Sequence, residues 1–465
     1  MEKDIDQIQQ KDQIEGLRRG LPMVEKFDQQ ALEQEKQILT EVNNRSSRFA
    51  RWKGYWKFAG PGWMQSAVTL GAGSAASAIF AGSVFGYKLL WVQPVSMLLG
   101  VIMFAAIGKQ VLTTRARPYD VFWKKLHPSL AIFWGFNVLL ASIVWQFPQY
   151  SLGTDVVRDI FDVFGIGLPK WIVALVLFSV ATYICWGYGR GKRKSIMLFE
   201  RTLKYLVLLM VVAFLGVVIR TGINWGELVK GYFGFYLPND VRGITILLGA
   251  LGAAVGVNMT FLYPYSLLAR GWGKEHQDLK NFDLATSMFI PFVLATSLVI
   301  IATANTLHIK GIEVRNAIDV AHTLEPIIGL TLSRIVFSIG ILSMCLTTMV
   351  LEMLICGFVL SEMFHFELQG RAYKVATLIA NIGILGAFYA MPFWLPVITS
   401  SFNLIMLPIA YACFFILQNR VDYLGKAVNS KSKGYAWNLA MLIAIFVVAM
   451  GAWVKILSVF GLIPK

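Results

Sequence analysis

Apolar runs of about 20 residues recur along most of the chain, separated by short polar gaps, and this feature restricts the possible folds most strongly. A helix of about 20 apolar residues spans the ~30 Å hydrocarbon core of a bilayer, and it satisfies its own backbone hydrogen bonds there. The sequence therefore predicts an all-α polytopic membrane protein with about 11 transmembrane helices. We place these spans at 56–85, 90–107, 130–150, 171–188, 203–221, 244–268, 284–307, 332–364, 375–393, 395–417 and 436–462.

The composition supports one membrane domain preceded by a polar segment. Hydrophobic residues make up 56% of the chain and charged residues only 15%, which is far from the composition of soluble domains. Residues 1–55 are rich in Gln, Glu, Asp and Lys, and they lack the apolar stretch of a signal peptide. We expect residues 1–55 to form a cytoplasmic extension, either a solvated tail or a regulatory, partner-binding helix, and residues 56–465 to form the membrane domain.

The net charge of +15 is distributed unevenly over the predicted loops. Basic residues concentrate at 109–125, 190–204, 270–280, 371–374 and 420–433, and the alternate loops carry fewer. The positive-inside rule then predicts a cytoplasmic amino terminus and a carboxyl terminus outside. Because these residues flank membrane spans and form no nucleic-acid-binding motif, we expect membrane lipid as a partner and no nucleic acid.

Cysteine and histidine give no sign of an enzyme. The four cysteines lie within predicted spans without CxxC spacing, and the five histidines lie in loops or at span ends. Neither pattern provides a nucleophile with a neighbouring base or a structural zinc site. We expect neither catalysis nor a cofactor.

Small residues interrupt two of the spans at corresponding positions. Residues 70–74 read Leu-Gly-Ala-Gly-Ser in the first span, and residues 255–260 read Val-Gly-Val-Asn-Met-Thr in the sixth. Two broken helices so placed are typical of inverted-repeat secondary transporters, in which freed carbonyls and half-helix ends bind the substrate. The pattern predicts one repeat at about 56–222, a second at about 243–418, and an extra helix at about 436–462.

Three motifs in the first span resemble the Nramp metal-transporter family. Gly60-Pro61-Gly62, residues 71–74 and the segment AGSVFGYKLLWV at 81–92 match the family's GPG, DPGN and AGS…GY.LLWV in order and without a gap. The similarity continues more weakly through the sixth to tenth spans. The resemblance implies a leucine-transporter-like fold of 5+5 inverted repeats with broken helices 1 and 6, and a divalent metal cation as substrate.

The chain departs from the family at the metal ligands. Gly71 and Ser74 stand where the family has the Asp and Asn of DPGN, and the Met of its MPH motif corresponds to Gly256 or to Asn258, depending on the register. The remaining neutral oxygens suit a hard or largely hydrated cation better than a soft transition metal. The chain thus resembles the Nramp-related magnesium transporters, a divergent branch without the sulfur ligand.

Glu352 is the carboxylate that we place well inside a span, where an ionisable residue marks an ion pathway or a paired structural group. Ser400 lies in the region of the tenth span where the resemblance puts a Gln near the metal. The predicted metal-site residues are Gly71, Ser74, Val255, Gly256, Asn258, Thr260, Glu352 and Ser400.

Proton coupling is not expected to be tight. Asn137, Gln146 and Gln149 replace acids that the resemblance assigns to a proton relay, and the sixth span contains no His. We therefore expect alternating-access transport of Mg²⁺ or a broad range of divalent cations, across the inner membrane of a bacterial cell. Two alternatives stay open: a transporter of the same fold for a non-metal solute, and a membrane sensor that does not transport.

Overall fold

The computed structural model describes residues 29–188, 205, 208 and 211–460, except for 59, 316, 367–369, 389–393 and 429–431. Within these residues, eight helices are long and apolar enough to cross a membrane, and the bent pair α4–α5 forms a ninth span. The apolar helix Val211–Thr221 is the described part of the fifth predicted span, whose start lies outside the described residues. The basic run at 190–204 also lies outside them.

The first half of the chain holds the predicted spans one to five. The bounds of its labelled helices are α2 Gln29–Asn43, α3 Arg48–Tyr55, α4 Pro61–Thr69, α5 Ala72–Phe85, α6 Val92–Thr114, α7 Pro118–Val121, α8 Pro128–Val163, α9 Lys170–Tyr188 and α11 Trp225–Phe233. The third span, α8, runs to Val163 and is longer than the predicted 130–150. Its last turns contain Asp159, which pairs with Arg334 on a neighbouring helix, so that this charged residue is accommodated within the helix.

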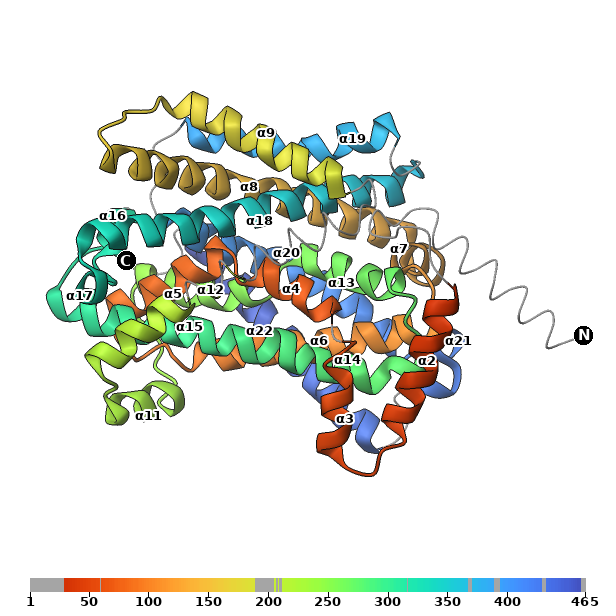
Figure 1. The fold of residues 1–465 in the computed structure, drawn as a ribbon. Helices are drawn as coiled ribbons and strands as arrows, with labels where there is room; N and C mark the ends of the chain where they lie inside the picture. The colour runs from red at the N-terminus through yellow and green to blue at the C-terminus, as the bar shows by residue number, and fades with distance from the viewer. Residues whose placement is uncertain are drawn as a thin grey trace, which may run out of the picture.

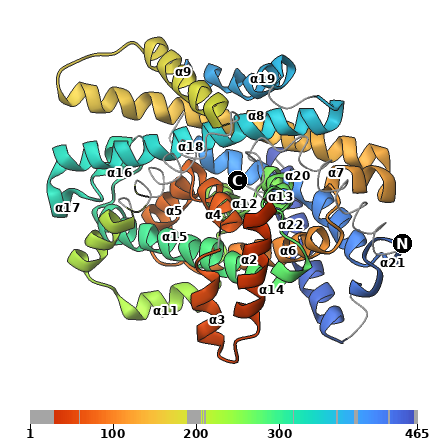
Figure 2. The ribbon, with the colours of Figure 1, turned by 45° about the vertical axis from the view of Figure 1, so that its right-hand side comes forward.

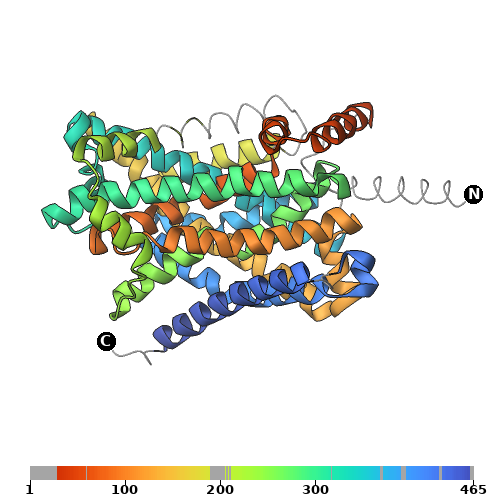
Figure 3. The ribbon, with the colours of Figure 1, turned by 90° about the horizontal axis from the view of Figure 1, so that it is seen from below.

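The second half repeats this order and adds one helix. Its elements are α12 Val241–Ala254, α13 Val257–Ala269, α14 Gln277–Asp283, α15 Ile290–Thr303, α16 Ala317–Ala321, α17 Glu325–Ile328, α18 Leu330–Phe364, α19 Arg371–Leu378, η5 Ile379–Ala387, α20 Leu395–Gln418, α21 Val421–Leu424 and α22 Ser432–Val459. The seventh span runs from Lys274 to His308 and combines α14 and α15 with short π-helical turns. Figure 3 shows α22 along the outside of the bundle, where it packs on α20 and α6.

The long helices run roughly side by side, and the connections gather at two opposite ends (Figure 1). Helices α2, α3, α7, α14 and α21 lie at one end, which we call the α3 end, and α11, α16 and α17 lie at the other. Figure 2 shows the same separation of α7 and α21 from α16 and α17. Successive spans therefore cross the bundle in alternating directions, as the predicted topology requires.

Both predicted helix breaks are present and are short. Leu70 and Gly71 separate α4 from α5, which are bent by 53° relative to each other. Val255 and Gly256 are extended and separate α12 from α13 with a smaller change of direction. The helix resumes at Ala72 and at Val257, so each break covers only the first residues of the predicted interruption. These four half-helices lie between the pair α8–α18 and the pair α6–α15 (Figure 1).

The described part of the N-terminal segment packs onto the membrane domain. Leu39 and Val42 of α2 are buried, and Asn43 donates from Nδ2 to the backbone oxygen of Glu275 at 3.2 Å. Tyr55 of α3 donates to Asn43 Oδ1 at 2.6 Å. Helices α2 and α3 therefore pack on each other and on the turn before α14 through these residues.

Candidate metal site

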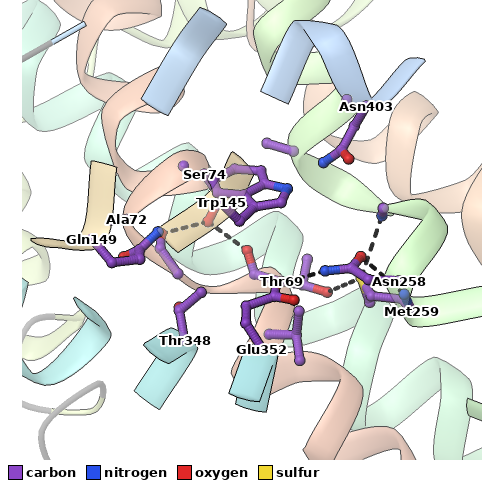
Figure 4. A pocket seen from close by; sticks show the side chains of 16 residues that line it. Thr69, Ala72, Ser74, Trp145, Gln149, Asn258, Met259, Thr348, Glu352 and Asn403 are labelled. Atoms are coloured by element: carbon purple, nitrogen blue, oxygen red, sulfur yellow. Dashed lines mark hydrogen bonds between the residues drawn. The ribbon is translucent and has the colours of Figure 1, made fainter. Parts of the chain in front are cut away.

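A small pocket lies where the two helix breaks face each other. Figure 4 shows side chains from the half-helices on its walls, together with residues of α8, α18 and α20. The lining residues are Val68, Thr69, Gly71, Ala72, Gly73, Ser74, Trp145, Gln149, Gly252, Ala253, Gly256, Asn258, Met259, Thr348, Glu352 and Asn403. Five of the eight predicted site residues are among them: Gly71, Ser74, Gly256, Asn258 and Glu352.

The first break presents oxygen atoms to this pocket. The hydroxyl of Ser74 donates to the carbonyl oxygen of Thr69 at 2.6 Å, which lies at the end of α4, and approaches that of Gly71 at 3.0 Å. The Gly71 carbonyl also accepts from the backbone N–H of Ala75 at 3.2 Å, as the first acceptor of α5. Gly71 also lies against α18, because a Cβ built on it would be 2.9 Å from Thr348 Oγ1. The absence of a side chain at Gly71 therefore lets the break approach α18 closely.

The second break presents an amide and a thioether. Asn258 accepts from the backbone N–H of Met259 at its Oδ1, at 2.9 Å, and donates from Nδ2 to Glu352 Oε1 at 2.6 Å. The sulfur of Met259 accepts from the backbone N–H of Gly256 at 3.4 Å and from the hydroxyl of Thr69 at 3.6 Å. Met259 thus joins the two breaks, and its sulfur is the one soft donor on the pocket wall.

Four carboxylates are buried among the described residues, and three of them are well supplied with donors. Asp159 accepts from Arg334 and from the Ser338 hydroxyl. Asp283 accepts from the backbone N–H groups of Gly60 and Gly62 and from Ser287. Glu362 accepts from Arg117 and Tyr265. Buried carboxylates with such partners are structural by their contacts.

Glu352 is the exception. It is only 1% exposed, and within the described residues no basic side chain forms an ion pair with it. Its Oε2 has the hydroxyl of Ser142 beside it, yet it forms no hydrogen bond of good geometry within the described part of the chain. An uncompensated carboxylate in an apolar interior is costly unless a cation or a proton neutralises it.

Other polar atoms on the same wall also lack partners in the described structure. These are both amide atoms of Gln149 on α8 and the hydroxyl of Thr348 on α18. In Figure 4, Thr348 and Glu352 lie along one wall with Gln149 on one side and Asn258 on the other. Buried polar groups in folded proteins almost always have a partner, so these groups are candidates for contact with a polar or charged ligand.

Three predicted site residues lie outside the pocket. Val255 lines a different, largely apolar cavity with residues of α6, α20 and α22. The hydroxyl of Thr260 donates to the carbonyl oxygen of Val257 at 2.6 Å and accepts from Trp134 Nε1 at 3.1 Å. Ser400 donates to the carbonyl oxygen of Pro396 in its own helix, as Ser commonly does within apolar helices. Each of these side chains is therefore engaged elsewhere.

Trp145, Met259 and Thr348 are among the lining residues that the sequence patterns did not indicate as site residues. Helical spacing could have found two of them, since Thr348 lies one turn before Glu352 on α18 and Trp145 one turn before Gln149 on α8. Met259 lies at neither of the two positions that correspond to the family's Met, so the motif does not indicate it. The local fold at the break turns the next thioether toward the pocket instead.

The donor set can hold a cation with a single protein carboxylate. No group of three or more His, Cys, Asp or Glu side chains that could hold a metal ion occurs among the described residues. The available oxygens are one carboxylate, hydroxyls, amides and freed carbonyls, which are hard and mostly neutral.

Comparison with known families gives one extended match. The model for natural resistance-associated macrophage protein-like (Nramp) sequences matches residues 62–456, which is most of the chain. The divalent metal cation transporter MntH of Klebsiella pneumoniae is 25% identical over 446 residues, covering 91% of this chain and 99% of that protein. The MntH of a Nostoc species is 22% identical and covers 91% and 96%, respectively.

Solved structures share the fold at low sequence identity. A manganese transporter from Eremococcus coleocola, in complex with an aromatic bis-isothiourea compound, has a TM-score of 0.68 at 14% identity and covers 90% of each chain. MhsT in complex with L-phenylalanine has a TM-score of 0.58 at 14% identity and covers 84% of this chain and 98% of that one. These likenesses confirm the predicted leucine-transporter-like architecture with broken first and sixth helices.

Proposed function

The chain belongs to the natural resistance-associated macrophage protein (Nramp) family, and on that premise we propose that it moves a divalent metal cation across a membrane by alternating access. The cation occupies the pocket between the two helix breaks, where Gly71, Ser74, Gly256, Asn258 and Glu352 meet. Alternating access then consists of movement of the broken half-helices relative to α8 and α18.

The observation that supports this proposal most directly is the state of Glu352. This carboxylate is buried and contacts the second break through Asn258. Its Oε2 has the Ser142 hydroxyl beside it and forms no hydrogen bond of good geometry within the described residues. A divalent cation at that oxygen removes the cost of the buried charge, and it also provides the partner that Thr348 and Gln149 lack.

Within this proposal the transported ion is Mg²⁺ or one of a broad range of divalent cations. Mg²⁺ binds through one or two carboxylates and keeps several of its waters, which fits a pocket with one carboxylate and neutral oxygens. The thioether of Met259 accepts two hydrogen bonds at the junction of the breaks. A ligand engaged in this way contributes less to selection of soft metals than a free thioether.

The amino terminus lies in the cytoplasm in this proposal and the carboxyl terminus outside, in the inner membrane of a bacterial cell. Support comes from the α3 end of the bundle, where the described connections carry Arg115, Arg117, Lys124, Lys125 and Arg270. Short loops rich in Lys and Arg remain on the cytoplasmic side. Labelling of a cysteine introduced at exposed Lys230, with a reagent that does not cross membranes, should succeed in intact cells.

Flux into proteoliposomes tests the main proposal. The purified full chain is reconstituted, and Mg²⁺, Mn²⁺ and Ca²⁺ are offered separately with an internal metal-sensitive dye, with and without a pH gradient. We expect Mg²⁺ flux at least equal to Mn²⁺ flux, and little effect of the pH gradient. Absence of flux for all three ions would overturn the proposal, and uptake of an organic solute under the same conditions would favour the alternative substrate class.

A further inference from the structure

The segment around α3 combines positive charge with large aromatic side chains. Five basic residues occur between positions 45 and 57, and no Asp or Glu occurs between Glu41 and Asp120. Three aromatic residues alternate with them. We call this group the α3 patch; it consists of Arg45, Arg48, Phe49, Arg51, Trp52, Lys53, Trp56 and Lys57.

The aromatic members of the α3 patch are exposed although they are large and apolar. Phe49 is 76% exposed, Trp52 55% and Trp56 56%. They follow one another at intervals of three and four residues, which puts them on one side of the helix. Gly54 and Tyr55 are buried and form the side that faces the protein.

Contacts with α14 and α2 hold the α3 patch in place. The rings of Trp52 and Trp56 both contact Phe282 of α14, the first tilted at a centroid distance of 6.2 Å and the second edge-on at 5.7 Å. Gly54 lies directly on Val42 of α2, since a Cβ built on it would be 2.6 Å from Val42 Cγ1. The exposed surface is therefore presented by a packed helix rather than by a flexible tail.

The charged members of the patch are available for a partner. Arg48, Lys53 and Lys57 are exposed, and none of them forms an ion pair within the described part of the chain. The positive charge of the patch therefore favours binding to an anionic surface. Its exposed aromatic rings favour a surface that has an apolar layer beneath the charged groups.

The position of α3 meets both requirements. It lies crosswise to the long helices at the α3 end of the bundle (Figures 1 and 3). Only a few residues separate its end at Tyr55 from Pro61, where the first membrane span begins. A helix crosswise to the spans and next to the start of one lies along the membrane surface.

We propose that the α3 patch docks on anionic lipid headgroups of the membrane in which the protein resides, with Phe49, Trp52 and Trp56 entering the interface. Tryptophan favours the headgroup region, and each Lys or Arg near an anionic surface adds about 1 kcal/mol of attraction. An amphipathic, basic helix with aromatic residues is the type that lies in the interface plane. The inference goes beyond the proposed transport function, because it concerns a surface remote from the pocket.

A fluorescent probe on the full chain tests this docking. Phe49→Cys is labelled with NBD, whose emission shifts to the blue and strengthens in an apolar surrounding; unlabelled sites give little background because Cys185, Cys345, Cys356 and Cys413 are buried. The labelled protein is placed in nanodiscs of phosphatidylcholine alone, or of phosphatidylcholine with added phosphatidylglycerol. We expect the blue shift with phosphatidylglycerol, and its reduction by high salt.

Charge variants separate docking from a general effect of net charge. Replacement of Arg48, Lys53 and Lys57 by Gln should lower the docking equilibrium about five-fold for each charge removed. The matched control replaces the exposed Arg220, Lys230 and Arg242 by Gln, which removes the same charge at the opposite end and should leave the emission unchanged. NBD emission typical of water in both lipid mixtures would overturn the proposal. A loss of the blue shift in the control variant equal to that in the patch variant would also overturn it.

Discussion

The side-chain amide of Asn258 donates a 2.6 Å hydrogen bond to Glu352, and this contact links the second helix break to the long helix α18. Both residues line the same pocket and both are almost completely buried. A cation that binds Glu352 must either share its carboxylate with Asn258 or displace the amide. Occupation of the site is therefore coupled to the position of α13, which is the relationship that alternating access requires.

The first prediction concerns Glu352 itself. Replacement of Glu352 by Gln should lower Mg²⁺ flux in proteoliposomes by at least about ten-fold, which corresponds to about 1.4 kcal/mol of lost attraction for the cation. The physical reason is that the remaining oxygens are neutral, so the carboxylate provides most of the electrostatic attraction in a site of low dielectric. The variant should fold, because the Gln carbonyl can still accept from Asn258.

Two companion variants interpret the result. Glu352→Asp keeps the charge and should retain part of the flux. Glu313→Gln alters an exposed carboxylate in the connection before α16, away from the pocket, and should have no effect on the flux. Wild-type flux in Glu352→Gln would show that the carboxylate is dispensable. Should Glu352→Gln unfold, a flux in Glu352→Asp no higher than that of empty liposomes would also contradict the prediction.

The second prediction concerns the thioether. Met259→Leu preserves size and apolar character, so Mg²⁺ flux should change by less than about two-fold if oxygen ligands dominate. Inhibition of that flux by Cd²⁺, a softer ion, should weaken because sulfur is its preferred ligand. Dose–response curves for Cd²⁺ with both proteins provide the measurement. A large loss of Mg²⁺ flux without loss of folded protein would mean that Met259 is essential to the pathway.

The architecture was readable from the sequence, whereas the composition of the pocket was readable only in part. Hydropathy marks spans because bilayer thickness fixes their length, and the small residues at 70–74 and 255–260 mark the breaks. Side-chain direction at a break does not follow from helical periodicity. For that reason the predicted metal site contains Thr260 and lacks Met259. In the structure Thr260 turns toward Trp134, and Met259 turns toward the pocket.

The carboxylates illustrate the same limit. Sequence alone singled out Glu352 by its depth within an apolar span, and the structure adds that Asp159, Asp283 and Glu362 are buried as well. What distinguishes Glu352 is its scarcity of hydrogen-bond donors, and donors such as Arg334 and Arg117 come from distant parts of the chain. Contacts of this kind are set by tertiary packing.

The third prediction is that metal influx occurs without matching acidification. Asn137, Gln146 and Gln149 on α8 cannot carry protons at neutral pH, and α12 and α13 contain no His. A pH-sensitive dye inside the proteoliposomes should report no proton entry that scales with Mg²⁺ flux. Proton entry in proportion to metal entry would require another relay, and its loss in Glu352→Gln would identify the carboxylate as part of it.

The last prediction concerns the packing that shapes the pocket. A Cβ built on Gly73 would lie 2.2 and 2.6 Å from ring carbons of Trp145, so Gly73→Ala forces the indole to move. Overpacking of this kind costs about 1–3 kcal/mol, which thermal unfolding in detergent would detect as a lower midpoint. Flux should fall as well, because both residues line the pocket.

A double variant and a matched glycine make this prediction specific. Adding Trp145→Leu to Gly73→Ala should recover part of the lost stability, because it removes the ring that the new methyl group contacts. Gly187→Ala is the control: Gly187 also lies within a helix but has no atom within 4 Å of a built Cβ. That change should raise stability slightly, by up to about 1 kcal/mol. Equal destabilisation by both alanines would contradict the close contact between Gly73 and Trp145.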